Sequence, residues 1–151
     1  MTIIFDGREF AKRKTEGAIR EIREIRENRG TIKLIAILVG DNPESELYLK
    51  LKEKKAKELG IEFEWGKFDG KDPAEILKFI EEKNNDLSVN GIIVELPLPE
   101  ELRIKNQELR ILNVIDSVKD IDCLTSENRK LLEEGKPRFV PPTVKAVGEI
   151  L

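Results

Sequence analysis

The sequence predicts an α/β domain with a mainly parallel sheet, flanked by helices on both faces in a three-layer arrangement. Three apolar, strand-like runs alternate with helix-like runs along the 151 residues. Such alternation is typical of βαβ units, whose crossover helices cover the two faces of a parallel sheet. The first run, Thr31 to Val39, is almost continuously apolar, as expected for a strand buried on both faces. A chain of this length fits one domain with a proper core.

Capping and turn residues predict where each element begins and ends. Asp6 and Asn42-Pro43 are N-terminal helix signals, and a glycine at position 30 or 60 is a typical helix stop. The run from Ile61 to Phe68 alternates well enough for a strand. In chain order we expect a helix over 7–28, a strand over 31–39, a helix over 43–59, a strand over 61–68, a helix from Asp72-Pro73, a strand over 92–96, a helix over 101–113 and a last helix entered through 140–143.

The composition narrows the chemistry. The chain has 39% hydrophobic and 38% charged residues and a net charge of -3, so neither nucleic acid nor a membrane is an expected partner. No apolar run approaches the roughly 20 residues of a membrane span, and we expect a cytoplasmic protein. One cysteine and no histidine exclude an internal disulfide, a Ser-His-Asp triad and a His-ligated zinc. A general base must therefore be Asp, Glu, Lys or Tyr, and no metal is expected.

Three polar segments approach the edge where the predicted parallel strands end, which is where ligands gather in such sheets. The first is GDNPESELYLKLK, residues 40–52. It places Tyr48 and Lys52 at i and i+4, on one helix face. Spacing alone favours an ordinary charged surface helix, but a lysine held beside an aromatic ring is also suited to proton transfer.

The other two segments, ELPLP (95–99) and KDID (119–122), hold carboxylates. Glu95 interrupts an apolar strand, so it either lies in water at the strand end or needs a cation or hydrogen-bond donors nearby. Asp120 and Asp122 are explained most simply as turn residues. A two-carboxylate metal site is the alternative, but no third ligand supports it. No glycine-rich phosphate-binding motif occurs. From the residues alone, the sequence predicts an α/β domain with a lysine/carboxylate cleft.

Four motifs in order resemble a known family over nearly the whole chain. They are VGDNPESELYLKLKEKKAKELGI (39–61), GIIVELPLPE (91–100), KDIDCL (119–124) and FVPPTVKAV (139–147). They are similar to motifs of the N-terminal, folate-binding domain of the bifunctional methylenetetrahydrofolate dehydrogenase/methenyltetrahydrofolate cyclohydrolase family. The resemblance implies that residues 1–151 are the tetrahydrofolate-binding catalytic domain of a two-domain enzyme. Residues from about 141 to 151 would begin the helix that links it to an absent dinucleotide-binding domain.

The resemblance also implies roles for single residues. Lys52 would be the catalytic lysine, Tyr48 would stack on the folate, and Asp122 would anchor the pterin ring. Glu95 would complete the catalytic set. The substrate-binding residues would be Tyr48, Lys52, Val94, Glu95, Leu96, Pro97 and Asp122.

The family oxidises 5,10-methylenetetrahydrofolate with NADP or NAD and hydrolyses the methenyl product to 10-formyltetrahydrofolate, in one-carbon metabolism and purine biosynthesis. The resemblance therefore implies tetrahydrofolate derivatives as ligands and a homodimer when full length. The nicotinamide cofactor would bind to the following domain, with no cofactor-binding residue in this chain. The chain ends within a predicted helix, and we expect it to be a piece of a longer protein.

Three positions depart from the family pattern. Glu95 replaces a glutamine, Cys123 replaces a glycine, and the run Pro141-Pro142-Thr143-Val144 replaces P-C-T-P. An ionised carboxylate only accepts hydrogen bonds, whereas an amide also donates them, and next to Lys52 it would favour the ammonium form. These departures keep an alternative open, namely a non-catalytic binding or regulatory module with a degenerate folate site.

Overall fold

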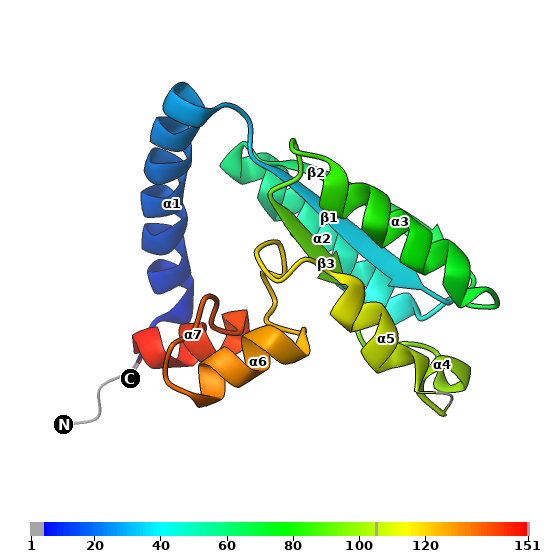
Figure 1. Cartoon of the computed structure of the whole chain (residues 1–151). Coiled ribbons are helices and arrows are strands. Elements are labelled where there is room, and N and C mark those ends of the chain that lie inside the picture. Colours follow the sequence, from blue (N-terminus) through cyan, green and yellow to red (C-terminus); the bar gives the residue numbers. More distant parts are fainter. Residues whose placement is uncertain (1–4, 105, 151) are drawn as a thin grey trace.

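A computed structural model describes residues 5–104 and 106–150, and it has the predicted α/β architecture (Figure 1). Its three parallel strands lie in the order β2-β1-β3, so the first strand is in the middle. The elements are α1 (Gly7–Arg29), β1 (Lys33–Val39), α2 (Pro43–Leu59), β2 (Glu62–Phe68), α3 (Pro73–Asn85), β3 (Gly91–Val94), α4 (Glu100–Ile104), α5 (Gln107–Val114), α6 (Ser126–Glu133) and α7 (Pro142–Ile150).

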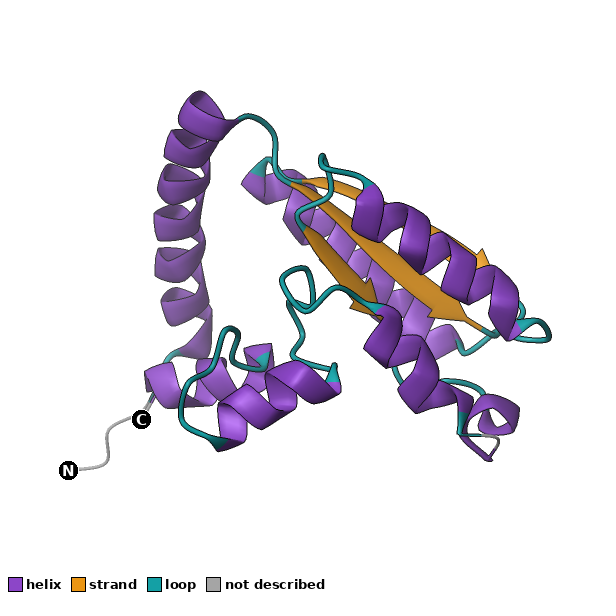
Figure 2. Cartoon of the chain, viewed as in Figure 1, coloured by secondary structure: helices purple, strands orange, loops and turns teal. Residues whose placement is uncertain are grey.

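Helices cover both faces of the sheet, as Figure 2 shows. Alternate β1 side chains point to opposite faces, because the side-chain period of a strand is two residues. Ile35 and Ile37 join the cluster that includes buried residues of α3 and α5. Ala36 and Leu38 pack with Leu49 of α2 on the other face. The prediction of a doubly buried first strand and a three-layer fold is confirmed.

The capping residues act as the sequence predicts. The Asp6 carboxylate accepts hydrogen bonds from the backbone N–H groups of Arg8 (3.0 Å) and Glu9 (3.1 Å). Asn42 accepts from the N–H groups of the first turn of α2, and Gly60 ends that helix in the left-handed conformation at φ 76°. A left-handed residue is the common helix stop, and glycine adopts it without a steric penalty.

Apart from shifts of one or two residues at other helix and strand ends, the structure differs from the prediction in three places. The third strand ends at Val94 rather than at residue 96. The expected helix over 101–113 is two helices, α4 and α5, separated near Asn106, which has a left-handed φ of 54°; residue 105 lies outside the described part of the chain. Helix α6 was not predicted, because its eight residues contain too few apolar positions to show a helical period.

Helices α1, α6 and α7 stand beside the sheet rather than on it (Figure 1). An ion pair of 2.8 Å between Lys14 and Glu149 connects α1 with α7. Neither α1 nor α7 contains a fully buried residue. Within 5–104 and 106–150, no helix is both long and apolar enough to cross a membrane.

The packing of α2 on the sheet yields a stability prediction. Leu49 has 0% exposure, so Leu49→Ala should lower the free energy of unfolding by about 2–5 kcal/mol through lost burial and a cavity. Leu47 lies on the same helix at 59% exposure, and Leu47→Ala should change it by less than about 0.5 kcal/mol. Urea unfolding followed by circular dichroism measures both. Equal losses for the two variants would contradict the described packing of α2.

Candidate active site at the carboxyl edge of the sheet

The carboxyl end of β3 places Glu95 beside helix α2. The Glu95 backbone N–H donates to the Ile37 carbonyl at 2.9 Å, so the pairing with β1 continues one residue beyond the strand. Because side chains alternate along this backbone, Glu95 points to the same face as Ile93, which packs with Leu49 of α2. The glutamate is therefore directed at the helix that carries Tyr48 and Lys52.

A short ion pair joins Lys52 to Glu95. The Lys52 Nζ atom lies 2.6 Å from Glu95 Oε1. The Glu95 side chain is only 7% exposed, whereas that of Lys52 is 40% exposed. A carboxylate this buried is costly unless a cation or donors compensate it, and Lys52 supplies the cation. The sequence left two alternatives open for Glu95: a position in water at the strand end, or a buried position with a nearby cation or donors. The first of these is wrong.

Asp122 brings a second carboxyl group to the same place. Burial raises the pKa of Asp122 above its ordinary value, the nearby Lys52 ammonium opposes that rise, and the charges of Glu95 and Asp120 add to it. Three chain segments far apart in sequence therefore meet here: α2, the end of β3 and the KDID segment. Clustered titratable groups with a shifted pKa are typical of functional sites, though ion-pair networks also produce them.

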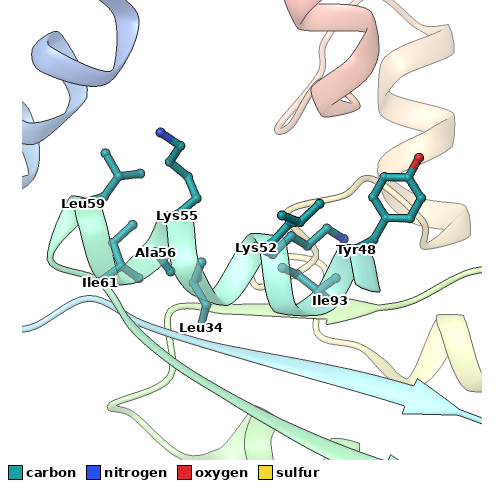
Figure 3. A pocket seen from close by; sticks show the side chains of 9 residues that line it. Leu34, Tyr48, Lys52, Lys55, Ala56, Leu59, Ile61 and Ile93 are labelled. Atoms are coloured by element: carbon teal, nitrogen blue, oxygen red, sulfur yellow. The ribbon is translucent and has the colours of Figure 1, made fainter. Parts of the chain in front are cut away.

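An apolar groove runs from this cluster along α2 (Figure 3). Its volume is about 390 Å³, and Tyr48 and Lys52 line one end while Leu59 and Ile61 line the other. The Tyr48 side chain is largely exposed, at 64%. A tyrosine ring at the mouth of an apolar groove offers a flat surface for a conjugated ligand.

The remaining residues expected at the site differ in their placement. Val94 is 2% exposed and packs into the core on the α3 side, so its side chain points away from Lys52. Leu96 is 38% exposed and Pro97 is also exposed, directly after the ion-paired Glu95. Ile93 lines the groove but was not among the expected residues. The period of two would have selected it, because it shares the face of Glu95.

Cys123, which replaces a glycine of the family motif, is buried and has a left-handed φ of 59°. Left-handed backbone favours glycine, so the conformation accounts for the glycine in the motif. Burial raises the pKa of the Cys123 thiol.

The described chain contains no metal or phosphate cradle. No group of three or more Cys, Asp or Glu side chains suited to a metal ion occurs in 5–104 and 106–150. The segments after the three strands begin GDNP, DGKD and ELPLP, none of which is a glycine-rich dinucleotide turn. These residues do not fit the pyrophosphate of a nicotinamide cofactor.

Comparison with known proteins identifies a family for this chain. The model for the catalytic domain of tetrahydrofolate dehydrogenase/cyclohydrolase matches residues 5–122. The bifunctional protein FolD of Ruminiclostridium cellulolyticum is 36% identical over 149 residues, which cover 98% of this chain and 51% of that protein. The chain spans about half the length of the curated relatives it matches.

Solved structures agree with the sequence matches. A 5,10-methylenetetrahydrofolate dehydrogenase from the silkworm Bombyx mori superposes with a TM-score of 0.90 at 32% identity, covering 100% of this chain and 51% of that chain. A Trypanosoma brucei methylenetetrahydrofolate dehydrogenase-cyclohydrolase, complexed with NADP cofactor and an inhibitor, gives 0.88 at 28% identity and covers 99% and 51%.

The shifted pKa of Asp122 predicts how its replacement affects stability. Because the folded-state pKa is raised, ionisation of Asp122 costs the folded chain stability once the pH exceeds the unfolded value of about 3.9. Asp122→Asn should therefore raise the free energy of unfolding at pH 7, because it removes the cost of the buried charge. The gain should fall with pH and vanish below about pH 3, where the carboxyl is protonated in both states. Urea unfolding between pH 3 and 8 measures it, and a variant less stable than the parent at pH 7 would contradict the assignment.

Proposed function

The chain belongs to the tetrahydrofolate dehydrogenase/cyclohydrolase family, and on that basis we propose that residues 1–151 supply the folate-binding catalytic domain of such an enzyme in one-carbon metabolism. The observation that carries the proposal is the convergence of Lys52, Glu95 and Asp122 beside a groove that Tyr48 lines. The ligand would be a tetrahydrofolate derivative carrying the one-carbon unit between its N5 and N10 atoms.

Each side chain suits one part of that ligand. The exposed Tyr48 ring stacks on the conjugated part of the folate. The Asp122 carboxyl group binds the donor-rich edge of the pterin, and its partial burial strengthens such hydrogen bonds. Leu96 and Pro97 provide exposed apolar contacts beside Glu95. Val94 contributes through its backbone, because its side chain lies in the core.

We assign the proton chemistry of the hydrolysis to Lys52. In that step water adds to the cationic methenyl carbon and the bond from this carbon to N5 breaks. As the formyl C=O forms, the oxygen loses both water protons, so that in balance one proton ends on N5 and the other is released to solvent. The Lys52 ammonium is suited to deliver the proton to N5, and Glu95 is suited to hold that ammonium in place. A glutamine at position 95 would not supply this counter-charge, so the chain departs from the family motif in electrostatics as well as in sequence.

The dehydrogenase step would use NADP or NAD, as the Trypanosoma brucei relative does with NADP. The cofactor accepts the hydride from the methylene carbon when bound. No described segment of this chain fits the pyrophosphate of the cofactor. We therefore propose that the cofactor binds to a second domain, which corresponds to the half of the relatives' length that this chain does not match. A helix at about 141–151 would link the two domains. Homodimerisation and a cytoplasmic location stay predictions.

The second candidate is a folate-binding or regulatory module without catalysis. Glu95 and Cys123 are the departures that favour it. Against it, Glu95 has the cation that a buried carboxylate needs, and Cys123 adopts the left-handed conformation that the glycine of the family motif favours. The two candidates differ in turnover, whereas both predict folate binding.

Binding of tetrahydrofolate to the chain tests the shared part of both candidates. Isothermal titration calorimetry should show weak binding that Asp122→Ala lowers by about 10-fold or more, because a charge-assisted hydrogen bond is lost. Glu133→Ala removes an exposed carboxylate on α6 and serves as the matched control. Absence of binding to the parent chain at millimolar ligand, or an equal loss in the control, would count against a folate site here.

Turnover by the full-length protein separates the candidates. Lys52→Ala should lower the cyclohydrolase kcat by about 100-fold or more, the usual contribution of a general acid, while Lys54→Ala on the exposed side of α2 should leave it near the parent value. A spectrophotometric assay of methenyltetrahydrofolate hydrolysis measures both.

Glu95→Gln completes this series. Under the enzyme proposal the parent is active and the Glu95→Gln variant changes its rate and pH profile. If neither the parent nor Glu95→Gln exceeded the uncatalysed rate, the non-catalytic module would be the correct assignment. Full turnover in Lys52→Ala would remove Lys52 from the proposed mechanism.

A further inference from the structure

We propose that Asp120 is a positioning residue of the folate site: its buried carboxylate folds the 119–125 segment so that Asp122 lies near Lys52 and Glu95. The effect of Asp120 on folate binding rests on the proposed function, whereas its effect on the position of Asp122 does not depend on any ligand. In the KDID segment, Lys119 and Asp120 anchor the backbone, and Asp122 faces the site.

The Asp120 carboxylate is the centre of a closed hydrogen-bond network. The residue has 0% exposure. Its Oδ1 atom accepts from the Leu124 N–H at 2.9 Å. Its Oδ2 atom accepts from the Thr125 N–H (2.9 Å), the Thr125 hydroxyl (2.8 Å) and the Asn128 side-chain amide (2.8 Å). A buried carboxylate that accepts this many hydrogen bonds holds its donors in place, because losing one leaves a costly unpaired group.

Lys119 anchors the start of the segment. Its Nζ atom donates to three backbone carbonyls at the end of α3, those of Lys83 (3.0 Å), Asn84 (2.7 Å) and Asp86 (2.8 Å). A cation is favoured there, because the last carbonyls of a helix lack helical donors. The Lys119 carbonyl accepts from the Ile92 N–H at 2.8 Å, and Asp120 forms a parallel bridge with Ile92. The segment thus extends the sheet beside β3.

Asp122 lies in the same segment, but its side chain has no comparable hydrogen bonds. Within 5–104 and 106–150, no hydrogen bond or ion pair holds its carboxyl group. The Cys123 N–H closes a turn onto the Asp120 carbonyl at 3.2 Å, and Cys123 is left-handed. The orientation of Asp122 therefore depends on the fold of its neighbours. The charged groups that act on it are Lys52 from α2, Glu95 after β3 and Asp120 from the same segment.

Variants at Thr125 test this dependence without changing a charge. Thr125→Val keeps the shape of a residue that is 2% exposed but removes the hydroxyl that donates to Asp120. Thr125→Ser keeps the hydroxyl and serves as the rescue variant. Thr125 also caps α6, so the matched control must remove a helix cap elsewhere. Asp72→Ala does so, because Asp72 caps α3 and follows β2, the strand on the other side of β1 from β3. Lys119→Met is a second test, since Lys119 is not among the charges acting on Asp122.

Two measurements on the chain are compared: the carbon-13 NMR titration of the Asp122 carboxyl group and the affinity for tetrahydrofolate. In Thr125→Val and Lys119→Met the pKa of Asp122 should fall toward the ordinary aspartate value, because the group becomes more solvated. The affinity should fall about 10-fold, as for a lost hydrogen bond to a charged group. Thr125→Ser and Asp72→Ala should match the parent in both measurements.

An unchanged titration of Asp122 in both Thr125→Val and Lys119→Met would overturn the positioning role. So would an equal change in Asp72→Ala, because the effect would then follow from general destabilisation. If the parent chain does not bind tetrahydrofolate, the proposed function fails, and the titration alone still decides the role of Asp120. If one variant does not fold, the other with its control carries the test.

Discussion

The buried carboxylate of Glu95 is the constraint on which the rest of the site depends. In a fully buried pair, removing one partner costs on the order of 3–5 kcal/mol, and the cost is smaller here because the Lys52 side chain is 40% exposed. The folded chain must still bring α2 to β3 with a lysine at this one position. This structural demand on Lys52 coincides with the catalytic role that we propose for it, and its exposed neighbour Lys54 has neither.

The topology explains why three distant segments meet. Parallel strands place their carboxyl ends at one edge, so residues after β1 and β3 are neighbours in space. The KDID segment joins them because Asp120 bridges to Ile92 as a further position beside β3. Hydrogen bonds from neutral donors offset the desolvation cost of burying the Asp120 carboxylate, whereas the positive charge of Lys52 offsets that of Glu95. Asp122 has no such hydrogen bonds, and the nearby Lys52 charge offsets its burial only in part, which is consistent with the ligand-binding role proposed for it.

Much of this arrangement was predictable from local sequence. Capping residues such as Asp6 and Asn42 fixed helix starts, and the apolar run before Gly40 identified a doubly buried strand. The resemblance singled out Lys52 and Glu95, whose contact the structure describes. The buried state of Glu95, the core position of Val94 and helix α6 depend on tertiary packing. The local sequence pattern could not predict these three features. The strand period of two would, however, have replaced Val94 by Ile93 among the expected site residues.

Mapping a tetrahydrofolate titration by nitrogen-15 NMR tests most directly whether the edge carrying Lys52, Glu95 and Asp122 is a folate site. For a folate site at this edge, we expect the largest shifts in the backbone signals of α2 around Tyr48 and Lys52, of residues 93–96 and of residues 119–124. Signals of β2 and of the α3 side of the sheet should stay in place. Shifts centred on β2 or on the α3 side, or shifts spread evenly over the chain, would contradict a folate site at this edge.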